Sequence, residues 1–189
     1  SLELQLQQQL AADQPTTDAQ EALDNYAPRL AEQFAPAFAA AGLRFWVHCD
    51  TAVAGTEIPI GAFSQVLNNL LINSLKYSYN GDVCVQFLMA QGQLQAVVTD
   101  EGLSIGNALH LPDDAEVNVR GKRAGSKGLR SISPVLQQLG WTLRLHAREH
   151  AGTRACLVCK SLKLKARSQK HQPLLHRLVL VALPDGDYT

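Results

Sequence analysis

The sequence predicts a two-layer α+β sandwich, in which a mixed, mostly antiparallel sheet packs against a layer of helices. Two observations support this prediction. Segments with apolar residues at helical spacing occur together with short segments in which every second residue is apolar, and most of the latter come in pairs joined by tight turns. Strands that follow one another directly favour antiparallel pairing, whereas a parallel sheet needs a crossover between successive strands.

Length and composition fit one soluble globular domain of ordinary size. The chain has 189 residues, of which 46% are hydrophobic and 18% are charged, so it can bury a core. Its 17 basic residues balance its 17 acidic residues, and without a basic excess we expect no nucleic-acid partner. No apolar run is long enough to span a membrane, and no export signal opens the chain. Four cysteines are too few for a disulfide scaffold, so we expect a cytoplasmic location.

The chain divides into three parts at changes in pattern. Residues 1–17 begin with leucines at helical spacing and are broken by Pro15, which is typical of the trailing end of a preceding helix and a linker. Residues 18–160 hold the predicted domain. Residues 161–189 form a basic linker and a strand-like segment.

The domain is expected to open with a helix over 18–40. Asp18 and Glu21 have the spacing of an N-terminal cap, and apolar residues recur at intervals of three and four along the segment. Gly42 ends this helix, and residues 43–49 alternate like a strand.

A second helix is predicted over 60–79, followed by two strands. The turn Asn80-Gly81 leads into a strand at 82–89, and Gln91-Gly92 joins it to a second strand at 93–99. Both dipeptides favour the backbone angles of tight turns, so the two strands are expected to form a hairpin.

The second half of the domain is expected to contain a loop, a helix and a hairpin. The loop covers 100–127, the helix runs over 128–138 and stops at Gly140, and two strands follow at 141–148 and 152–159.

The C-terminal segment has a different composition. Residues 160–177 carry six lysines and arginines and no acidic residue, as in a solvated linker. An apolar run follows at 178–183, with Asp185 and Asp187 behind it. This run resembles the first strand and acidic turn of a receiver domain, which would make the parent protein a hybrid kinase. A strand added to the sheet of the same domain is an equal alternative.

The helix over 60–79 has an apolar face and a polar face. The polar stripe consists of Gln65, Asn69, Asn73 and Lys76, at spacings of four, four and three. Asparagine is a poor helix former, so two of them on one stripe are unexpected in a helix that is merely solvated. Their amide oxygens lie one turn apart and are hard ligands of the kind that Mg²⁺ accepts together with phosphate and water.

Two further motifs follow this helix in order. Asp100-Glu101-Gly102 places a carboxylate at a strand end and a glycine after it, and Gly125-Ser126-Lys127-Gly128-Leu129 opens the next helix. Small residues let backbone amides approach a polyphosphate closely, and a helix N-terminus favours negative charge. Each motif is common alone, but the ordered set is much rarer.

These motifs resemble those of the histidine-kinase catalytic domain, in the GHKL ATPase superfamily. Residues 65–78 are similar to the N-box, residues 100–105 to the first glycine box, and residues 125–132 to the second. The resemblance covers about 20–160 and implies the Bergerat fold, an α/β sandwich that binds ATP and Mg²⁺ under a lid.

Carried over by position, the resemblance implies which residues hold the phosphates and the metal. Asn73 is expected to coordinate Mg²⁺, with Asn69 assisting, and Lys76 is expected to approach the phosphates. The residues expected beneath the phosphates at the helix start are Lys127, Gly128 and Leu129.

The resemblance also implies how the base is bound. Asp100 is expected to accept the adenine amino group, because a carboxylate needs a donor opposite it. Gly102 is expected to let the backbone pass close to the base, and Tyr77 to line the pocket.

The sequence departs from the family pattern at several positions. Ser104, Ala124 and Ser126 stand where the family has glycine, and positive φ at such positions costs a non-glycine residue about 1 kcal/mol or more. Pro134 lies early in the helix over 128–138, where proline is expected to be tolerated only if it falls in the first turn. A basic cluster in the predicted lid, available either to solvent or to phosphates, consists of Arg120, Lys122 and Arg123.

The chain has no phosphoacceptor histidine of the usual kind, because none of its six histidines precedes an acidic residue. The resemblance therefore implies partners: a domain that carries this histidine and forms the dimer in the full-length parent, and the receiver domain of a response regulator.

Two other patterns are given little weight. His146 and His150 match the H-x-x-E-H pattern of zinc proteases, which requires a helix where a strand and turn are predicted. Cys156 and Cys159 are three residues apart on a predicted strand and so face opposite sides.

Three functions remain open from the sequence. The first is an ATP-binding, catalytic domain of a sensor histidine kinase, which transfers the γ-phosphoryl group of Mg-ATP to a histidine on another domain in two-component signalling. The second is a degenerate, non-catalytic module of the same fold that acts by protein–protein docking. The third is a serine kinase like the anti-sigma factors, which share the fold.

Overall fold

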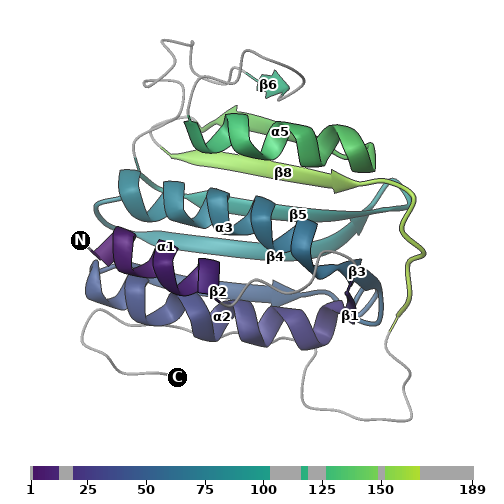
Figure 1. Ribbon diagram of the computed structural model, residues 1–189, viewed down its shortest axis with the longest axis horizontal. Helices are drawn as coiled ribbons and strands as arrows, with labels where there is room; N and C mark the ends of the chain where they lie inside the picture. The colour runs from purple at the N-terminus through teal and green to yellow at the C-terminus, as the bar shows by residue number, and fades with distance from the viewer. Residues whose placement is uncertain (1, 13–18, 103–115, 119–126, 149–151, 167–189) are drawn as a thin grey trace.

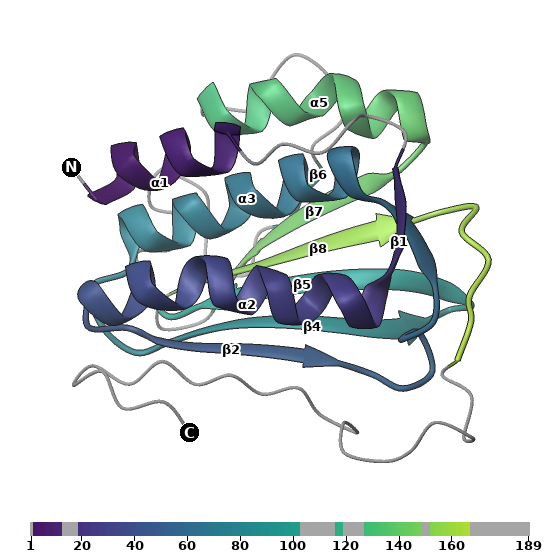
Figure 2. The same ribbon diagram turned by 60° about the horizontal axis from the view of Figure 1, so that its bottom comes forward.

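The structure, a computed structural model, describes residues 2–12, 19–102, 116–118, 127–148 and 152–166. It is a two-layer sandwich, with one sheet covered on a single face by helices (Figures 1 and 2). The fold class predicted from the sequence is confirmed.

The main sheet has six strands in the order β2-β4-β5-β8-β7-β6. Only β2 and β4 pair in parallel, and the other neighbours are antiparallel. The strands are β2 (Arg44–Cys49), β4 (Asp82–Ala90), β5 (Gln93–Asp100), β6 (Glu116–Asn118), β7 (Thr142–Ala147) and β8 (Thr153–Cys159). A separate antiparallel pair is formed by β1 (Gln20–Ala22) and β3 (Glu57–Pro59).

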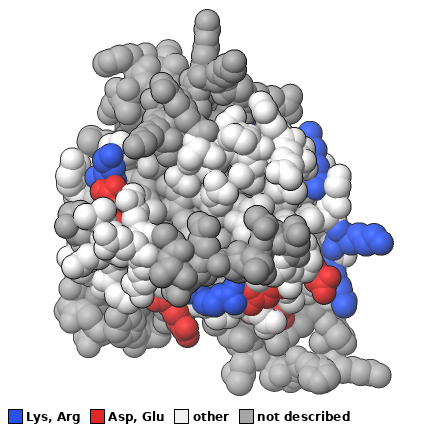
Figure 3. All heavy atoms as spheres, viewed as in Figure 1, with Lys and Arg blue, Asp and Glu red and all other residues white. Residues whose placement is uncertain are grey.

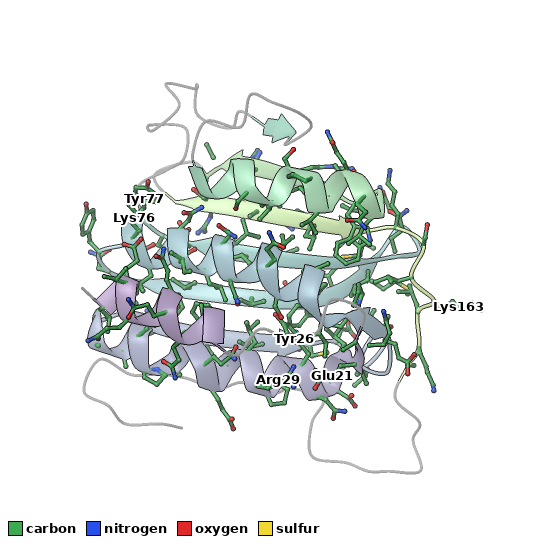
Figure 4. The ribbon with its side chains drawn as sticks, viewed as in Figure 1. Glu21, Tyr26, Arg29, Lys76, Tyr77 and Lys163 are labelled. Carbon is green, nitrogen blue, oxygen red and sulfur yellow. The ribbon has the colours of Figure 1, made fainter. Side chains whose placement is uncertain are left out.

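The helices form the second layer. They are α1 (Leu2–Ala12), α2 (Leu23–Ala40), α3 (Ile60–Tyr77) and α5 (Lys127–Leu139). In Figures 1 and 2, α3 lies between α2 and α5, and α1 lies beside α2 and α3. α3 crosses from the β3 end of the sheet to the opposite end, where Lys76 and Tyr77 lie (Figure 4).

The core lies between the sheet and the helices. Its largest fully buried side chains include five phenylalanines, whose rings contact one another and Tyr26. They are Phe34, Phe38, Phe45, Phe63 and Phe87. Alternate strand residues point into this core, as the period of two requires, so the other residues of each strand face away from the helices.

The register of the sheet fixes the position of Asp100. β4 and β5 form the predicted hairpin through Gln91 and Gly92, which both have positive φ, +52° and +71°. β8 then pairs with β5 so that Asp100 lies opposite Thr153. The carboxylate at the end of β5 is therefore held beside the start of β8.

The predicted helix cap at the start of the domain is wrong. The helix begins at Leu23, not near Asp18, and Ala22 precedes it without a side-chain cap. Glu21 lies in the short strand β1, and its Oε1 accepts a hydrogen bond from Arg29 Nη1 at 2.8 Å (Figure 4). Asp18 lies outside the described residues.

The expectation that Pro134 would be tolerated only in the first turn of its helix is also wrong. α5 begins at Lys127, so Pro134 is in the helix interior rather than the first turn. There it removes one backbone hydrogen bond, which ordinarily costs about 3 kcal/mol.

The segment after β8 packs against the domain. Leu162 and Leu164 are partly buried against the core. Gly55 N donates to Lys165 O at 2.8 Å, and Lys165 N donates to Thr56 Oγ1 at 2.9 Å. Residues 160–166 therefore run from β8 to the turn that precedes β3 (Figure 1).

Within the described ranges, no helix has both the length and the apolar character that crossing a bilayer requires. On the helix side of the molecule, the described charged side chains lie mainly toward the periphery (Figure 3).

Candidate functional site

The candidate site lies between α3, the start of α5 and the end of β5. The apolar face of α3 is buried in the core, and the predicted polar stripe is on its remaining surface: Gln65, Asn69 and Asn73 are half-buried and Lys76 is exposed. Gln65 Nε2 donates to the backbone oxygen of Ser131 in α5 at 3.4 Å. The polar stripe therefore begins on the flank of α3 that faces α5.

The contact between α3 and α5 determines which residues of α5 lie opposite the two asparagines. The helices run in opposite directions (Figure 1), so one turn from Gln65 toward the C-terminus of α3 corresponds to one turn from Ser131 toward the N-terminus of α5. Asn69 therefore lies opposite Lys127, the first residue of α5. Asn73 lies about one turn beyond that N-terminal end of α5. The free amides at the start of α5 therefore lie on the flank of α3 that carries the polar stripe.

Asn69 is oriented by its own helix. Its Nδ2 donates to the backbone oxygen of Gln65 at 2.9 Å. Among the described residues its Oδ1 takes no hydrogen bond, so this oxygen remains available as a ligand.

Lys76 and Tyr77 lie at the C-terminal end of α3, on the exposed side (Figure 4). The Lys76 ammonium is 5.3 Å from the centroid of the Tyr77 ring, within the range of a cation–π contact. Tyr77 is 38% exposed, so its ring remains open to a further neighbour.

Asp100 is held by donors from three different elements. Its Oδ2 accepts from Ser74 Oγ at 2.9 Å, and its Oδ1 accepts from Thr153 N at 3.0 Å and from Gly102 N at 3.3 Å. Arg148 Nη1 donates to the Asp100 backbone oxygen at 3.0 Å. Since a carboxylate oxygen accepts about two hydrogen bonds, Oδ2 retains room for one more donor.

Burial raises the pKa of Asp100 above its ordinary value of 3.8. The side chain is only 9% exposed, and desolvation disfavours its charged form. The hydrogen bonds from Ser74, Thr153 and Gly102 and the positive charge of Arg148 lower the pKa and partly offset burial.

Gly102 is required by the packing of the strand end against α3. A Cβ at this position would lie 2.5 Å from both Ser78 Oγ and the Tyr77 backbone oxygen. Gly152 is required on the other side of Asp100, because it has φ of +99° and a Cβ there would lie 2.1 Å from the Asp100 backbone oxygen. Two glycines therefore let three chain segments meet at Asp100.

Sequence reasoning missed three of the residues that surround Asp100. Ser74 had a usable signal, since it is a small polar residue at a position that continues the apolar stripe of α3. Thr153 and Arg148 had none, because only the pairing of β5 with β8 brings them close to Asp100.

Several residues of the predicted site lie outside the described part of the chain. They are Ser104, Arg120, Lys122, Arg123, Ala124, Gly125 and Ser126. For Lys127, Gly128 and Leu129, the structure describes the helical backbone at the start of α5.

The histidine pair His146 and His150 and the cysteine pair Cys156 and Cys159 were the two patterns given little weight. In the described part of the chain, no group of histidine, cysteine and acidic side chains could hold a metal ion. Cys159 points into the core, whereas Cys156 points to the opposite face and its Sγ lies 3.3 Å from Gln95 Oε1. The predicted division of the two cysteines between the faces is confirmed. His150 lies outside the described residues.

Comparison with known proteins locates this fold among solved structures. Neither a model of a known protein family nor any curated protein matches the sequence. Full-length ShkA in complex with AMPPNP superposes with a TM-score of 0.63 at 15% identity, over 87% of this chain and 35% of that one. The chain thus spans about a third of ShkA.

Two histidine kinases are similar over most of their solved chains. The histidine kinase AdeS of Acinetobacter baumannii gives a TM-score of 0.56 at 16% identity, over 83% of this chain and 74% of AdeS. The catalytic domain of histidine kinase ThkA gives 0.58 at 17% identity, over 75% of this chain and 94% of that domain.

The chain is therefore an α+β sandwich, the class of fold that the sequence predicts. More particularly, it has the fold of the histidine-kinase catalytic domain.

Proposed function

We propose that this chain is the ATP-binding, catalytic domain of a sensor histidine kinase. In this proposal it positions Mg-ATP so that the γ-phosphoryl group passes to a histidine on another domain in two-component signalling. The observation that carries the proposal is the arrangement around α3: a buried carboxylate, two amide side chains and a helix N-terminus lie along one helix in the order that base, metal and phosphates require.

The residues fit the parts of a magnesium nucleotide. Asp100 is fixed in position with one acceptor site free, which suits the amino group of adenine. Asn69 and Asn73 offer uncharged oxygens of the type that Mg²⁺ takes alongside phosphate. The first amides of α5 suit phosphate oxygens, with Lys127, Gly128 and Leu129 beneath them.

The parts played by the chain's own residues are positioning and charge compensation. Lys76 is an exposed cation beside the asparagines and compensates phosphate charge, and Tyr77 lines the base side of the site. Asn69 and Asn73 would hold Mg²⁺, which would supply positive charge to offset that of the phosphates. We propose as partners a histidine-bearing dimerisation domain and a response-regulator receiver domain, with a cytoplasmic location.

Calorimetric titration of the chain with Mg-ATP, or with a non-hydrolysable analogue, tests this proposal. We expect saturable binding that Asn73→Ala abolishes, because this change removes a metal ligand and little packing. Asn68→Ala is the matched control, since Asn68 is on the same helix but on a different flank, and it should leave binding unchanged. Absence of heat at millimolar nucleotide, with the protein shown to be folded, would refute nucleotide binding.

The alternative function is a non-catalytic docking module of the same fold. It is favoured by the residues that replace glycine at 104, 124 and 126 and by Pro134 in the interior of α5. In that case Ser126→Gly would leave nucleotide binding undetectable, whereas in a strained but competent site it would tighten binding.

A further inference from the structure

Arg148 attaches the turn end of the β7–β8 hairpin to the end of β5. Its backbone N–H donates to the Gly152 backbone oxygen at 3.1 Å, which holds the two sides of the turn together. Its side-chain Nη1 donates to the Asp100 backbone oxygen at 3.0 Å. A single arginine therefore joins this turn to the strand end that carries the carboxylate of the candidate site.

The Asp100 carboxylate is in a place where its charge needs compensation. Asp100 lies opposite Val83 of β4 and on the same face of β5 as Val98, and both valines belong to the core beneath the helices. A carboxylate that leaves water is costly to keep ionised unless hydrogen bonds and positive charge stabilise it. Burial raises the pKa of Asp100, and the charge of Arg148 is among the influences that lower it.

Among the described residues, Arg148 is the one charged group that acts on this carboxylate. The donors that α3 and β8 present to Asp100 are a hydroxyl and a backbone N–H, which are uncharged. Glu101, the next residue along the chain, is exposed and accepts a hydrogen bond from Asp82 N at 2.9 Å. Lys76 is exposed at the end of α3, beside the aromatic ring that follows it. The compensating positive charge therefore comes from the β7–β8 turn.

Arg148 supplies this charge without occupying the carboxylate. Direct pairs of arginine and carboxylate are frequently bidentate, so that both carboxylate oxygens are engaged. Here the guanidinium donates to the backbone oxygen of Asp100, and Oδ2 keeps room for one more donor beside Ser74. This arrangement suits a carboxylate that has to be ionised and still has to accept a hydrogen bond from a ligand.

We propose that Arg148 is a positioning residue for base recognition, which holds the β7–β8 turn against Asp100 and supplies the positive charge that this buried carboxylate needs. This role rests on the proposed function, in which Asp100 accepts the adenine amino group. Without the Arg148 charge the ionised carboxylate is less stable, so it takes up a proton at a higher pH. Binding of the base is then lost at a higher pH during acidification.

The test is the pH dependence of adenosine binding, measured by calorimetry between about pH 4 and pH 8. Arg148→Met keeps an unbranched side chain and loses the charge. We expect it to shift the midpoint of the profile to higher pH and to weaken binding severalfold near that midpoint. Arg148→Lys keeps the charge and should have a midpoint close to that of the unmodified chain. The matched control is Arg144→Met, which removes an exposed arginine of the same hairpin and should leave the midpoint unchanged.

An unchanged midpoint in Arg148→Met would overturn this role, even if binding were weaker, because a purely structural contact weakens binding equally at every pH. Arg148→Gln loses the same charge and provides the midpoint if Arg148→Met does not fold. Absence of adenosine binding to the unmodified chain would refute the proposed function, and the role of Arg148 with it. Binding by the unmodified chain, with the same midpoint in the uncharged variants, would refute the role of Arg148 alone.

Discussion

One end of the β4–β5 hairpin is the turn at Gln91 and Gly92. At the other end, Asp100 and Gly102 lie beside Gly152, which directly precedes β8. Gly92 has φ of +71°, and a Cβ there would meet nothing within 4 Å. A Cβ on Gly152 or Gly102 would lie 2.1 Å or 2.5 Å from neighbouring atoms. At the turn, Gly92 is therefore required only for its backbone conformation. At the candidate site, close packing requires both Gly102 and Gly152, and Gly152 is also required for its positive φ.

The difference separates an end of the sheet that serves the fold from the end that carries the candidate site. The Gln91-Gly92 end holds a hairpin turn that local sequence determines. The Asp100 end is built by β5, β8 and α3 together, and it encloses a carboxylate whose pKa is raised by burial. Such a packed and polar corner is costly to build, which fits a site held in one geometry for a ligand.

Replacing Gly152 should have the largest effect on stability. Gly152→Ala combines positive φ with a contact of 2.1 Å to the Asp100 backbone oxygen, so we expect a loss of about 3 kcal/mol or more in the free energy of unfolding. Gly92→Ala has positive φ alone and should cost about 1 kcal/mol. Urea denaturation of both variants measures the contrast, and equal losses would remove the distinction between the two ends.

Replacing Gly102 should mainly affect binding. In Gly102→Ala the new methyl group must displace Ser78 or the backbone at Tyr77, which shifts the end of α3 beside the site. We expect roughly tenfold weaker binding of Mg-ATP, since small misplacements of site residues are expensive. Gly92→Ala again serves as the control, and calorimetry should give it the affinity of the unmodified chain.

Asp100→Asn should reduce the preference for ATP over GTP by about tenfold, because it weakens one hydrogen bond to the base. Glu101→Gln is the matched control, since the neighbouring acid is exposed. Competition binding with the two nucleotides gives the ratio. An unchanged ratio in Asp100→Asn would exclude Asp100 from base recognition.

The raised pKa of Asp100 predicts a smaller effect of pH. Because the folded-state pKa lies above the ordinary 3.8, the folded protein takes up a proton at Asp100 before the unfolded chain does. The contribution of Asp100 to stability is therefore greatest at low pH, where it is protonated, and is lost as pH rises through the raised pKa. Asp100→Asn should remove this dependence, as urea denaturation between pH 4 and pH 8 would show.

Adenine recognition should change in the opposite direction. The ionised carboxylate is the better acceptor, so binding of adenosine should weaken as pH falls through the raised pKa. Adenosine is the suitable probe because it carries no phosphate to titrate. A flat profile would mean that Asp100 does not contact the base.

Local patterns in the sequence were sufficient to predict several features at the two ends of the hairpin. The turn at Gln91-Gly92, the polar stripe of α3 and the carboxylate at the end of β5 all follow from spacing and turn chemistry. Ser74 and Thr153 could not be paired with Asp100 in advance, because they are 26 and 53 residues away from it. Contacts of that kind depend on the order of strands in the sheet.

The incorrect predictions have similar causes. Asp18 and Glu21 have cap spacing, but Glu21 lies in the three-residue strand β1, which is too short to be recognised from alternation. Pro134 is tolerated inside α5 because the helix is held by tertiary contacts, with Ile132 and Leu136 buried in the core.

The strand order of the sheet has a consequence for how the protein is made. β8, the last strand of the domain in sequence, lies between β5 and β7 rather than at an edge. During synthesis from the N-terminus, β5 and β7 cannot be joined until residues 153–159 have left the ribosome. Until then the nascent chain exposes the open side of β5, to which a chaperone or another unfinished chain can pair.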